Sequence, residues 1–484
     1  MARRTAPDTT AQADRLGSRP VGRLLWHTCS QTTLSVGVYG IYALTNAWFV
    51  ARGVGPTAMA GVNLVAPVLL GLGAVSTTVG VGGASLVSRS LGTGDPARAA
   101  RAAGNAFVVF WAAAVVTTVA GLVFLGPLLT ALGATGATLG YARDYAVVIL
   151  AGALVSTGFS ALVRAEGRML FSTMLWLVPV LVQITLDPIL IFGLDLGVRG
   201  AALGTVGGQA VSAAMSIWFF FVQRRRPYRI GWADLRPRAR TVGALIGIGA
   251  PSFLAGLGTT VLAVLVNLSL ARDDAAGAGA AAGGAVALAA YAICARVQTF
   301  VTMPQTGISQ GLQPIVGYNA GARLDERVAR ARTLALRATV AYGIGAATVV
   351  ALLAEPLVRL FVDEPDVVRT ATDALRIIAV GVALAGVTPL VSAYFQALGR
   401  ARPSYVLSVG TLLVLKVPLV LALGPQGPTG TWVALAAGEV LSAACAFVVL
   451  HRAGRAEPAP GRTVGRDRPG QRGRRRRRRR WRNP

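Results

Sequence analysis

Long apolar runs recur along the whole chain, and they limit the folds that it can adopt. A helix that crosses a bilayer needs about 20 mostly apolar residues, and by this criterion about twelve runs can be placed. They lie at 24–50, 58–87, 102–126, 141–163, 170–193, 199–222, 242–271, 285–315, 333–355, 371–398, 404–424 and 430–451. Only 14% of the residues are charged, against about 25% in soluble domains. The sequence therefore predicts an all-α integral membrane protein.

Charge in the connections between these spans indicates the orientation. Arginines gather after the even-numbered spans and in two short turns: Arg89, Arg98, Arg101, Arg224, Arg225, Arg226, Arg229, Arg323, Arg327 and Arg330, with Arg164, Arg168, Arg400 and Arg402 in the turns. Cytoplasmic loops carry the excess of Lys and Arg, so we expect both termini in the cytoplasm of a bacterium and the spans in its inner (plasma) membrane. Trp26, Trp48, Trp218 and Trp432 lie near span ends, which is typical of an interfacial aromatic belt.

The two halves of the chain resemble each other. Gly92 in LVSRSLGTGDPARAARAA aligns with Gly321 in IVGYNAGARLDERVARARTLA, 229 residues later. RAEGR at 164–168 matches QALGR at 396–400, and Pro188 aligns with Pro418. Similar offsets for separate pairs predict two pseudo-symmetric six-helix bundles, and because six is even the two copies share one orientation, as a parallel repeat. The expected division is a tail at 1–22, an N-lobe at 23–222, a basic linker at 223–240, a C-lobe at 241–451 and an Arg-rich tail at 452–484.

One carboxylate stands inside an apolar run. Asp187 lies in LVPVLVQITLDPILIFG (177–193) and is followed by Pro188. An acid at the centre of a membrane helix costs roughly 2.5–3.5 kcal/mol on insertion scales, so polar partners, protonation or a bound cation must offset it. The proline removes a backbone donor and clashes with the preceding turn, so we expect the helix to bend or open there. An intramembrane acid at such an irregularity indicates a functional site.

Several stretches identify a family resemblance. NAWFVARGVGPTAMAGVNLVAPV, LVSRSLGTGD, LDPILIFGLDLGVRGAALGT, IGIGAPSF and MPQTGISQGLQPIVGYNAGA are similar to prokaryotic multidrug and toxic compound extrusion (MATE) transporters, in the same order along the chain. The resemblance covers about residues 26–450. It implies a secondary antiporter that exports small organic, often cationic, compounds by alternating access, in exchange for H⁺ or Na⁺.

The resemblance also implies a cation site in the N-lobe, made of an Asp on the first span and an Asn, an Asp and a Thr on the fifth and sixth. Asp187 and Thr205 match two of these positions, whereas Gln183 stands in place of the Asn and Asn46 in place of the first-span Asp. Gln31 stands where the family often has a proline. The loss of a carboxylate weakens a Na⁺ site more than a protonation site, so H⁺ is favoured and Na⁺ at Asp187 is the alternative. A purely structural role for Asp187 in holding helices together stays open.

Further polar residues lie in the apolar runs of the C-lobe. Lys416, the single lysine of the chain, is the repeat partner of Asp187, and Glu439 lies in the last span. A Lys416–Glu439 pair would neutralise both charges, and we favour this structural interpretation over a role in coupling. Uncharged polar residues on the seventh and eighth spans either line a substrate cavity or form hydrogen bonds between helices: Asn267, Gln298, Gln305 and Gln310.

No other chemistry is indicated by motifs. The sequence holds no GxxxxGK[ST] loop for ATP and no HExxH or GxSxG motif of an enzyme, so we expect a transporter that is not an enzyme, without a cofactor or a resident metal, and monomeric. The tail from Arg452 carries fourteen arginines against two acids; we expect it to bind anionic lipids, at about 1 kcal/mol per residue near the surface, rather than nucleic acid. Two alternatives remain: a lipid-linked oligosaccharide flippase of the related superfamily, and a membrane scaffold that transports nothing.

Overall fold

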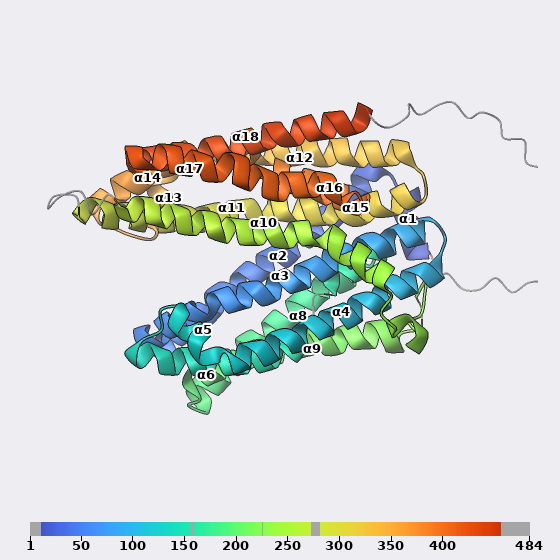
Figure 1. The fold of residues 1–484 in the computed structure, drawn as a ribbon, viewed down its shortest axis with the longest axis horizontal. Coiled ribbons are helices and arrows are strands. Elements are labelled where there is room, and N and C mark those ends of the chain that lie inside the picture. Colours follow the sequence, from blue (N-terminus) through green and yellow to red (C-terminus); the bar gives the residue numbers. More distant parts are fainter. Residues whose placement is uncertain (1–10, 156–158, 225, 273–280, 456–484) are drawn as a thin grey trace, which may run out of the picture.

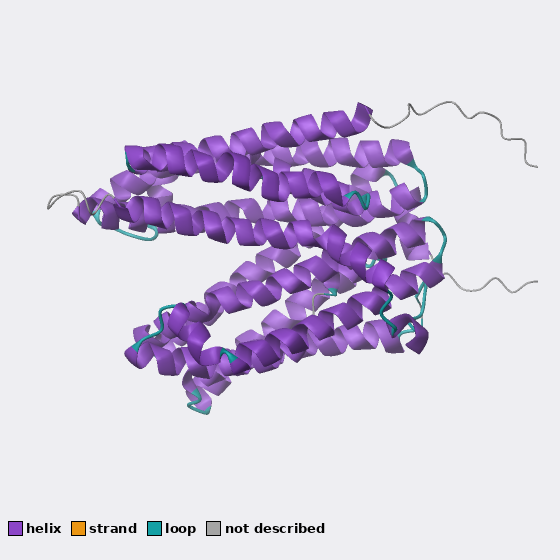
Figure 2. Ribbon diagram, in the orientation of Figure 1, coloured by secondary structure: helices purple, strands orange, loops and turns teal. Residues whose placement is uncertain are grey.

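The structure, a computed structural model, describes residues 11–155, 159–224, 226–272 and 281–455, and this part of the chain is helical without any strand (Figures 1 and 2). Within it, eleven helical segments are long and apolar enough to cross a membrane. Helix α2 (Val21–Gly53) is a further long helix, with 33 residues. The predicted all-α fold of about twelve spans is therefore confirmed. The arginine run of the C-terminal tail lies outside the described residues.

The first bundle, blue to green in Figure 1, contains the amino-terminal half of the chain. It is preceded by the short helix α1 (Ala11–Ser18). Besides α2, its helices are α3 (Pro56–Gly92), α4 (Pro96–Val123), α5 (Leu125–Ala131), α6 (Gly136–Gly152), α7 (Ser160–Ala165), α8 (Met169–Pro188) and α9 (Gly197–Ile217), with π-helical turns at Ile189–Gly193 and Trp218–Val222 and 3₁₀ turns at Ala153–Val155 and Trp232–Leu235.

The second bundle repeats the first. Its helices are α10 (Ala239–Arg272), α11 (Ala281–Gly321), α12 (Asp325–Leu352), α13 (Ala354–Arg359), α14 (Pro365–Ala385), α15 (Val387–Ala397), α16 (Ala401–Tyr405), α17 (Val417–Leu423) and α18 (Pro428–Arg455), with π-helical turns at Val406–Gly410 and Leu412–Lys416 and a 3₁₀ turn at Gly424–Gln426. Helices α12, α13 and α14 each begin 229 residues after α4, α5 and α6. The duplication predicted from the sequence is thus present in the helix boundaries.

The two bundles lie together at one end of the molecule and diverge toward the other (Figure 1). The joined end carries α1, the linker and the arginine-rich connections α3–α4 and α11–α12, and we call it the basic end. Helices α2 and α3 of the first bundle pack there against α10 and α11 of the second. Small residues allow the close approach, because a methyl group on Gly82 would overlap the carbonyl of Leu245, and one on Gly249 would overlap the carbonyl of Thr78.

The helix irregularity predicted beside Asp187 is confirmed. Helix α8 ends at Pro188 and continues directly into the π-helical turn Ile189–Gly193. The equivalent place in the second bundle is also irregular, because a π-helical turn ends at Lys416, two residues before Pro418. Single π-helical turns inside helices widen the spiral and often mark functional sites.

The linker between the bundles lies against the first bundle. The side chain of Asn105 on α4 donates to the carbonyls of Asp234 (3.0 Å) and Arg236 (3.3 Å) and accepts from the amide of Arg238 (2.8 Å). Closer to α9, Arg226 forms a buried ion pair with Glu166, which follows α7. The predicted basic linker is therefore fixed to the first bundle at both of its ends.

Two residues lie elsewhere than the sequence predicted. Trp26, Trp48 and Trp218 are exposed, as an interfacial belt requires, but Trp432 is 2% exposed and stacks on Tyr291 inside the second bundle. Arg164, placed by its neighbours in a charged turn, belongs to α7 and is 6% exposed. Both predictions were wrong because the position of a residue near a span end does not reveal the helix that covers it.

Candidate functional site

The four residues proposed for the N-lobe site come together from three helices. Asn46 lies on α2, Gln183 and Asp187 on α8, and Thr205 on α9, and all four are buried. The Gln183 amide nitrogen lies 3.3 Å from Asp187 Oδ2 and 3.3 Å from Thr205 Oγ1. Asn46 Nδ2 donates to the same Thr205 Oγ1 at 3.1 Å. We call this set the polar cluster.

A stripe of glycines on α9 allows the polar cluster to form. Gly200, Gly204 and Gly208 recur every fourth residue and face α8, where added methyl groups would press on the Leu190 carbonyl, the Asp187 carboxyl and the Pro179 carbonyl. Small residues at this spacing let membrane helices approach closely. The stripe was visible in the sequence as GAALGTVGG, but the analysis above did not use it. It shapes the site because Gly204 leaves room for the carboxyl group of Asp187.

The carboxyl group of Asp187 is incompletely hydrogen-bonded. Its Oδ2 accepts from Gln183, whereas its Oδ1 is buried against Gly204 without a hydrogen-bond partner among the described residues. The side chain is completely buried, and no cation of the described residues pairs with it. An ionised carboxylate without compensation is strongly disfavoured in such surroundings, so the arrangement suits a neutral acid or an acid that meets a cation.

The second bundle holds a charge pair at the equivalent depth. Lys416 Nζ lies 2.6 Å from Glu439 Oε1, on α18, and each side chain is 20% exposed. The two residues predicted as a pair are therefore brought together. Where the first bundle places an acid among neutral partners, the second places two charges that neutralise each other.

The four uncharged polar residues proposed to line a cavity have different surroundings. Asn267 is exposed and Gln298 is half-buried. Gln305 is buried, and neither polar atom of its side chain has a hydrogen-bond partner among the described residues. Gln310 accepts a hydrogen bond from Arg164. Neither of two cavities at the surface, one beside α1 and one beside α14 and α18, is lined by these residues or by the polar cluster.

Arg164 is a polar group that the sequence analysis did not single out. Its guanidinium is buried and donates to Ser160 (3.4 Å) and Ser172 (3.2 Å) of its own bundle and to Gln310 Oε1 (3.2 Å) of the other. It therefore joins the two bundles near the basic end. The sequence offered only a weak signal, namely that Arg164 aligns with Gln396 in the repeat, where the charge is absent.

Comparisons with known proteins agree with this fold. A family model, MatE, matches residues 33–189 and 276–421. The multidrug export protein MepA of Staphylococcus haemolyticus (strain JCSC1435) is 28% identical over 420 residues, which cover 85% of this chain and 88% of that protein.

Two solved structures extend the comparison. An outward-facing multidrug resistance MATE family transporter of the MOP superfamily superposes with a TM-score of 0.82 at 22% identity, over 93% of this chain and 99% of the other. A MOP superfamily transporter from Pyrococcus furiosus Vc1 (DSM3638) gives 0.84 at 23% identity, over 94% and 100%. At this level of identity the likeness shows the fold.

Proposed function

Because the chain belongs to the MatE family of efflux transporters, we propose that it exports small organic compounds, often cationic ones, across a bacterial plasma membrane in exchange for protons, which bind at Asp187. The observation that carries the proposal is the buried Asp187 carboxyl, of which one oxygen has no hydrogen-bond partner among the described residues. Such a group changes its protonation when its surroundings change, because burial disfavours the charged form. The relative MepA, described as a multidrug export protein, supports the class of substrate.

The hydrogen bonds of the polar cluster favour H⁺ over Na⁺. A sodium ion needs oxygen ligands, but the amides of Gln183 and Asn46 direct N–H groups at Thr205 Oγ1, and Gln183 also directs one at Asp187. Those N–H groups would repel a cation placed between them. A proton on Oδ1 instead removes the charge while the bond from Gln183 to Oδ2 persists.

Two arranged bundles support alternating access. They lie together at the basic end and apart at the other (Figure 1), an arrangement that resembles the outward-facing relative. We propose that the basic end faces the cytoplasm, because arginine-rich connections stay on that side. In the proposed cycle, protonation of Asp187 in this state permits release of substrate outside, and proton loss to the cytoplasm follows the reversal of the bundles.

The remaining proposals concern partners and the second bundle. We propose that the chain acts as a monomer, that its Arg-rich tail binds anionic lipids, and that Lys416 and Glu439 stabilise their bundle without carrying the coupling ion. Gln298, Gln305 and Asn267 stay proposed contacts of the substrate. The flippase and the scaffold alternatives have no observation in their favour.

The test is transport by the purified protein in liposomes, with ethidium as a fluorescent cationic substrate and with pH and Na⁺ gradients imposed separately. We expect the pH gradient alone to drive ethidium movement, and Asp187→Asn to abolish it. Asp195→Asn is the matched control, because Asp195 is exposed and lies at φ 51°, a conformation that asparagine also tolerates. Ethidium movement under Na⁺ alone would overturn the choice of ion, and movement under neither gradient would overturn the antiporter proposal.

A further inference from the structure

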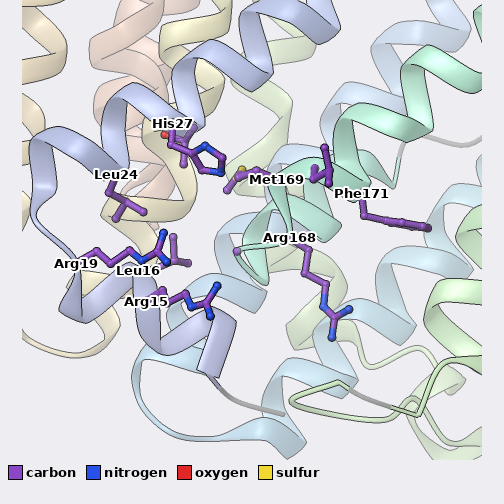
Figure 3. A pocket seen from close by; sticks show the side chains of 11 residues that line it. Arg15, Leu16, Arg19, Leu24, His27, Arg168, Met169 and Phe171 are labelled. Carbon is purple, nitrogen blue, oxygen red and sulfur yellow. The ribbon is translucent and has the colours of Figure 1, made fainter. Parts of the chain in front are cut away.

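A cavity of about 260 Å³ lies at the basic end, between α1 and the start of α8 (Figure 3). Its lining includes Arg15, Arg19, Arg168 and His27 beside the apolar Leu24 and Phe171. None of the described residues that line it is acidic. The volume falls below the range of about 300–1,000 Å³ of sites for drug-sized ligands, so the cavity suits a smaller, negatively charged group.

One wall of this cavity is attached to the second bundle. Asn319 Nδ2, near the end of α11, donates to the carbonyl of Leu16 at 2.9 Å, and Arg327 Nη2 on α12 donates to the carbonyl of Arg19 at 2.6 Å. Helix α1 also packs on α11. Although α1 precedes the first bundle in sequence, it is therefore fixed to the second.

The opposite wall belongs to the first bundle. It is formed by residues 167–171, which include the turn between α7 and α8 and the first residues of α8. Figure 3 shows Arg15 and Arg19 on the side of α1, with Arg168 across the cavity from them. Any ligand that touches both walls contacts both bundles at the end where they lie together.

The charges of this cavity are available to a ligand. Arg15 and Arg19 are exposed and form no ion pair among the described residues. Apolar surface lies beside them, because Leu170 is 61% exposed and Trp26, one turn along α2 from Arg23, is 78% exposed. Cations next to exposed apolar and aromatic side chains are typical of the membrane–water interface.

We propose that this cavity binds the phosphate-bearing headgroup of an anionic phospholipid from the cytoplasmic leaflet, and that the bound lipid stabilises the arrangement in which the basic ends of the bundles are joined. The phosphate meets Arg15 and Arg19, and an acyl chain follows Leu170 into the bilayer. The orientation and the effect on transport rest on the proposed function, whereas lipid binding and its effect on bundle separation can be measured without transport.

The test uses the full-length protein with spin labels at residues 98 and 330, which are exposed at the basic ends of the two bundles. It is reconstituted in phosphatidylcholine vesicles with increasing fractions of phosphatidylglycerol, and the distance between the labels is measured. We expect phosphatidylglycerol to enrich the short distance. With about 1 kcal/mol for each arginine near an anionic surface, the double variant Arg15→Gln, Arg19→Gln should need roughly 30-fold more anionic lipid for the same shift.

The matched control is Arg23→Gln, because Arg23 is exposed on α2 close to the cavity but does not line it. The control should respond as the unchanged protein does. An equal response of the double variant would overturn the proposal, since the C-terminal tail or the surface charge would then account for it. Inorganic phosphate that reproduces the shift in phosphatidylcholine alone would overturn the lipid as the source. A lipid effect on bundle separation in a protein that transports under no gradient would leave this inference standing and remove the proposed function.

Discussion

Gly92 and Gly321 occupy equivalent positions at the last residues of α3 and α11, and each packs against the helix of the other. A methyl group on Gly92 would overlap the carbonyl oxygen of Tyr318, and one on Gly321 would overlap the carbonyl oxygen of Arg89. Tyr318 follows Arg89 by the same 229 residues that separate the two glycines. The contact is therefore reciprocal, and it fixes how closely the basic ends of the bundles approach.

Gly321→Ala is expected to weaken the joined state. The added methyl group meets backbone rather than a movable side chain, and overpacking of this kind costs about 1–3 kcal/mol. We predict a larger separation of labels at residues 98 and 330 and slower proton-driven export of ethidium. Gly71→Ala is the control, because Gly71 lies within α3 with nothing near its added methyl group; an equal effect of both changes would contradict a role of the contact.

Gly204→Ala is expected to block coupling while Asp187 stays in place. The methyl group would overlap Asp187 Oδ1, so the carboxyl group must turn away from the polar cluster. We predict that ethidium export driven by a pH gradient falls at least tenfold while the protein folds and inserts. Gly207→Ala, on the same helix, meets only the tip of Leu186 and should retain transport. Full activity of Gly204→Ala would show that the geometry at Oδ1 does not matter.

Lys416→Met and Glu439→Gln should each destabilise the second bundle. Either change leaves one charge without its partner in a largely apolar region, and loss of one member of a buried pair costs about 3–5 kcal/mol, less where water reaches it. The double variant should recover most of the apparent melting temperature and retain transport. A stable double variant without pH-driven export would instead assign these residues to coupling.

Tyr228, in the linker and outside the spans, should make stability depend on alkaline pH. Burial raises the pKa of its phenol well above 10, and the nearby Glu166 carboxylate raises it further although Arg226 lowers it. Because the folded pKa exceeds the unfolded one, the stabilisation is complete below pH 10 and is lost as pH rises toward the folded pKa. The free energy of unfolding should then fall by about 1.4 kcal/mol per pH unit. Tyr228→Phe should remove this dependence, which Tyr405→Phe should leave in place.

Local patterns were sufficient to predict the spans, the repeat and the members of the polar cluster. Apolar length places a helix in the membrane without reference to other segments, and Gln183 and Asp187 share a helix face because they are four residues apart. The irregularity at Pro188 likewise follows from the chemistry of one residue.

Contacts between distant segments could not be predicted in this way. Gln310, the partner of Arg164 in the other bundle, lies 146 residues later, and no periodicity in either segment indicates that they meet. Trp432 near a span end is compatible with the bilayer surface and with the stack on Tyr291 inside the bundle. Only the packing of whole helices distinguishes the two.

The attachment of the linker has a consequence for how the molecule moves. Since Glu166 holds Arg226 and Asn105 holds the chain as far as Arg238, those residues travel with the first bundle. Helix α10 begins at Ala239, directly after the last of these bonds. The slack for a rocking motion is therefore almost nil, and the fulcrum of the second bundle lies at the start of α10 instead of being spread along a loose tether.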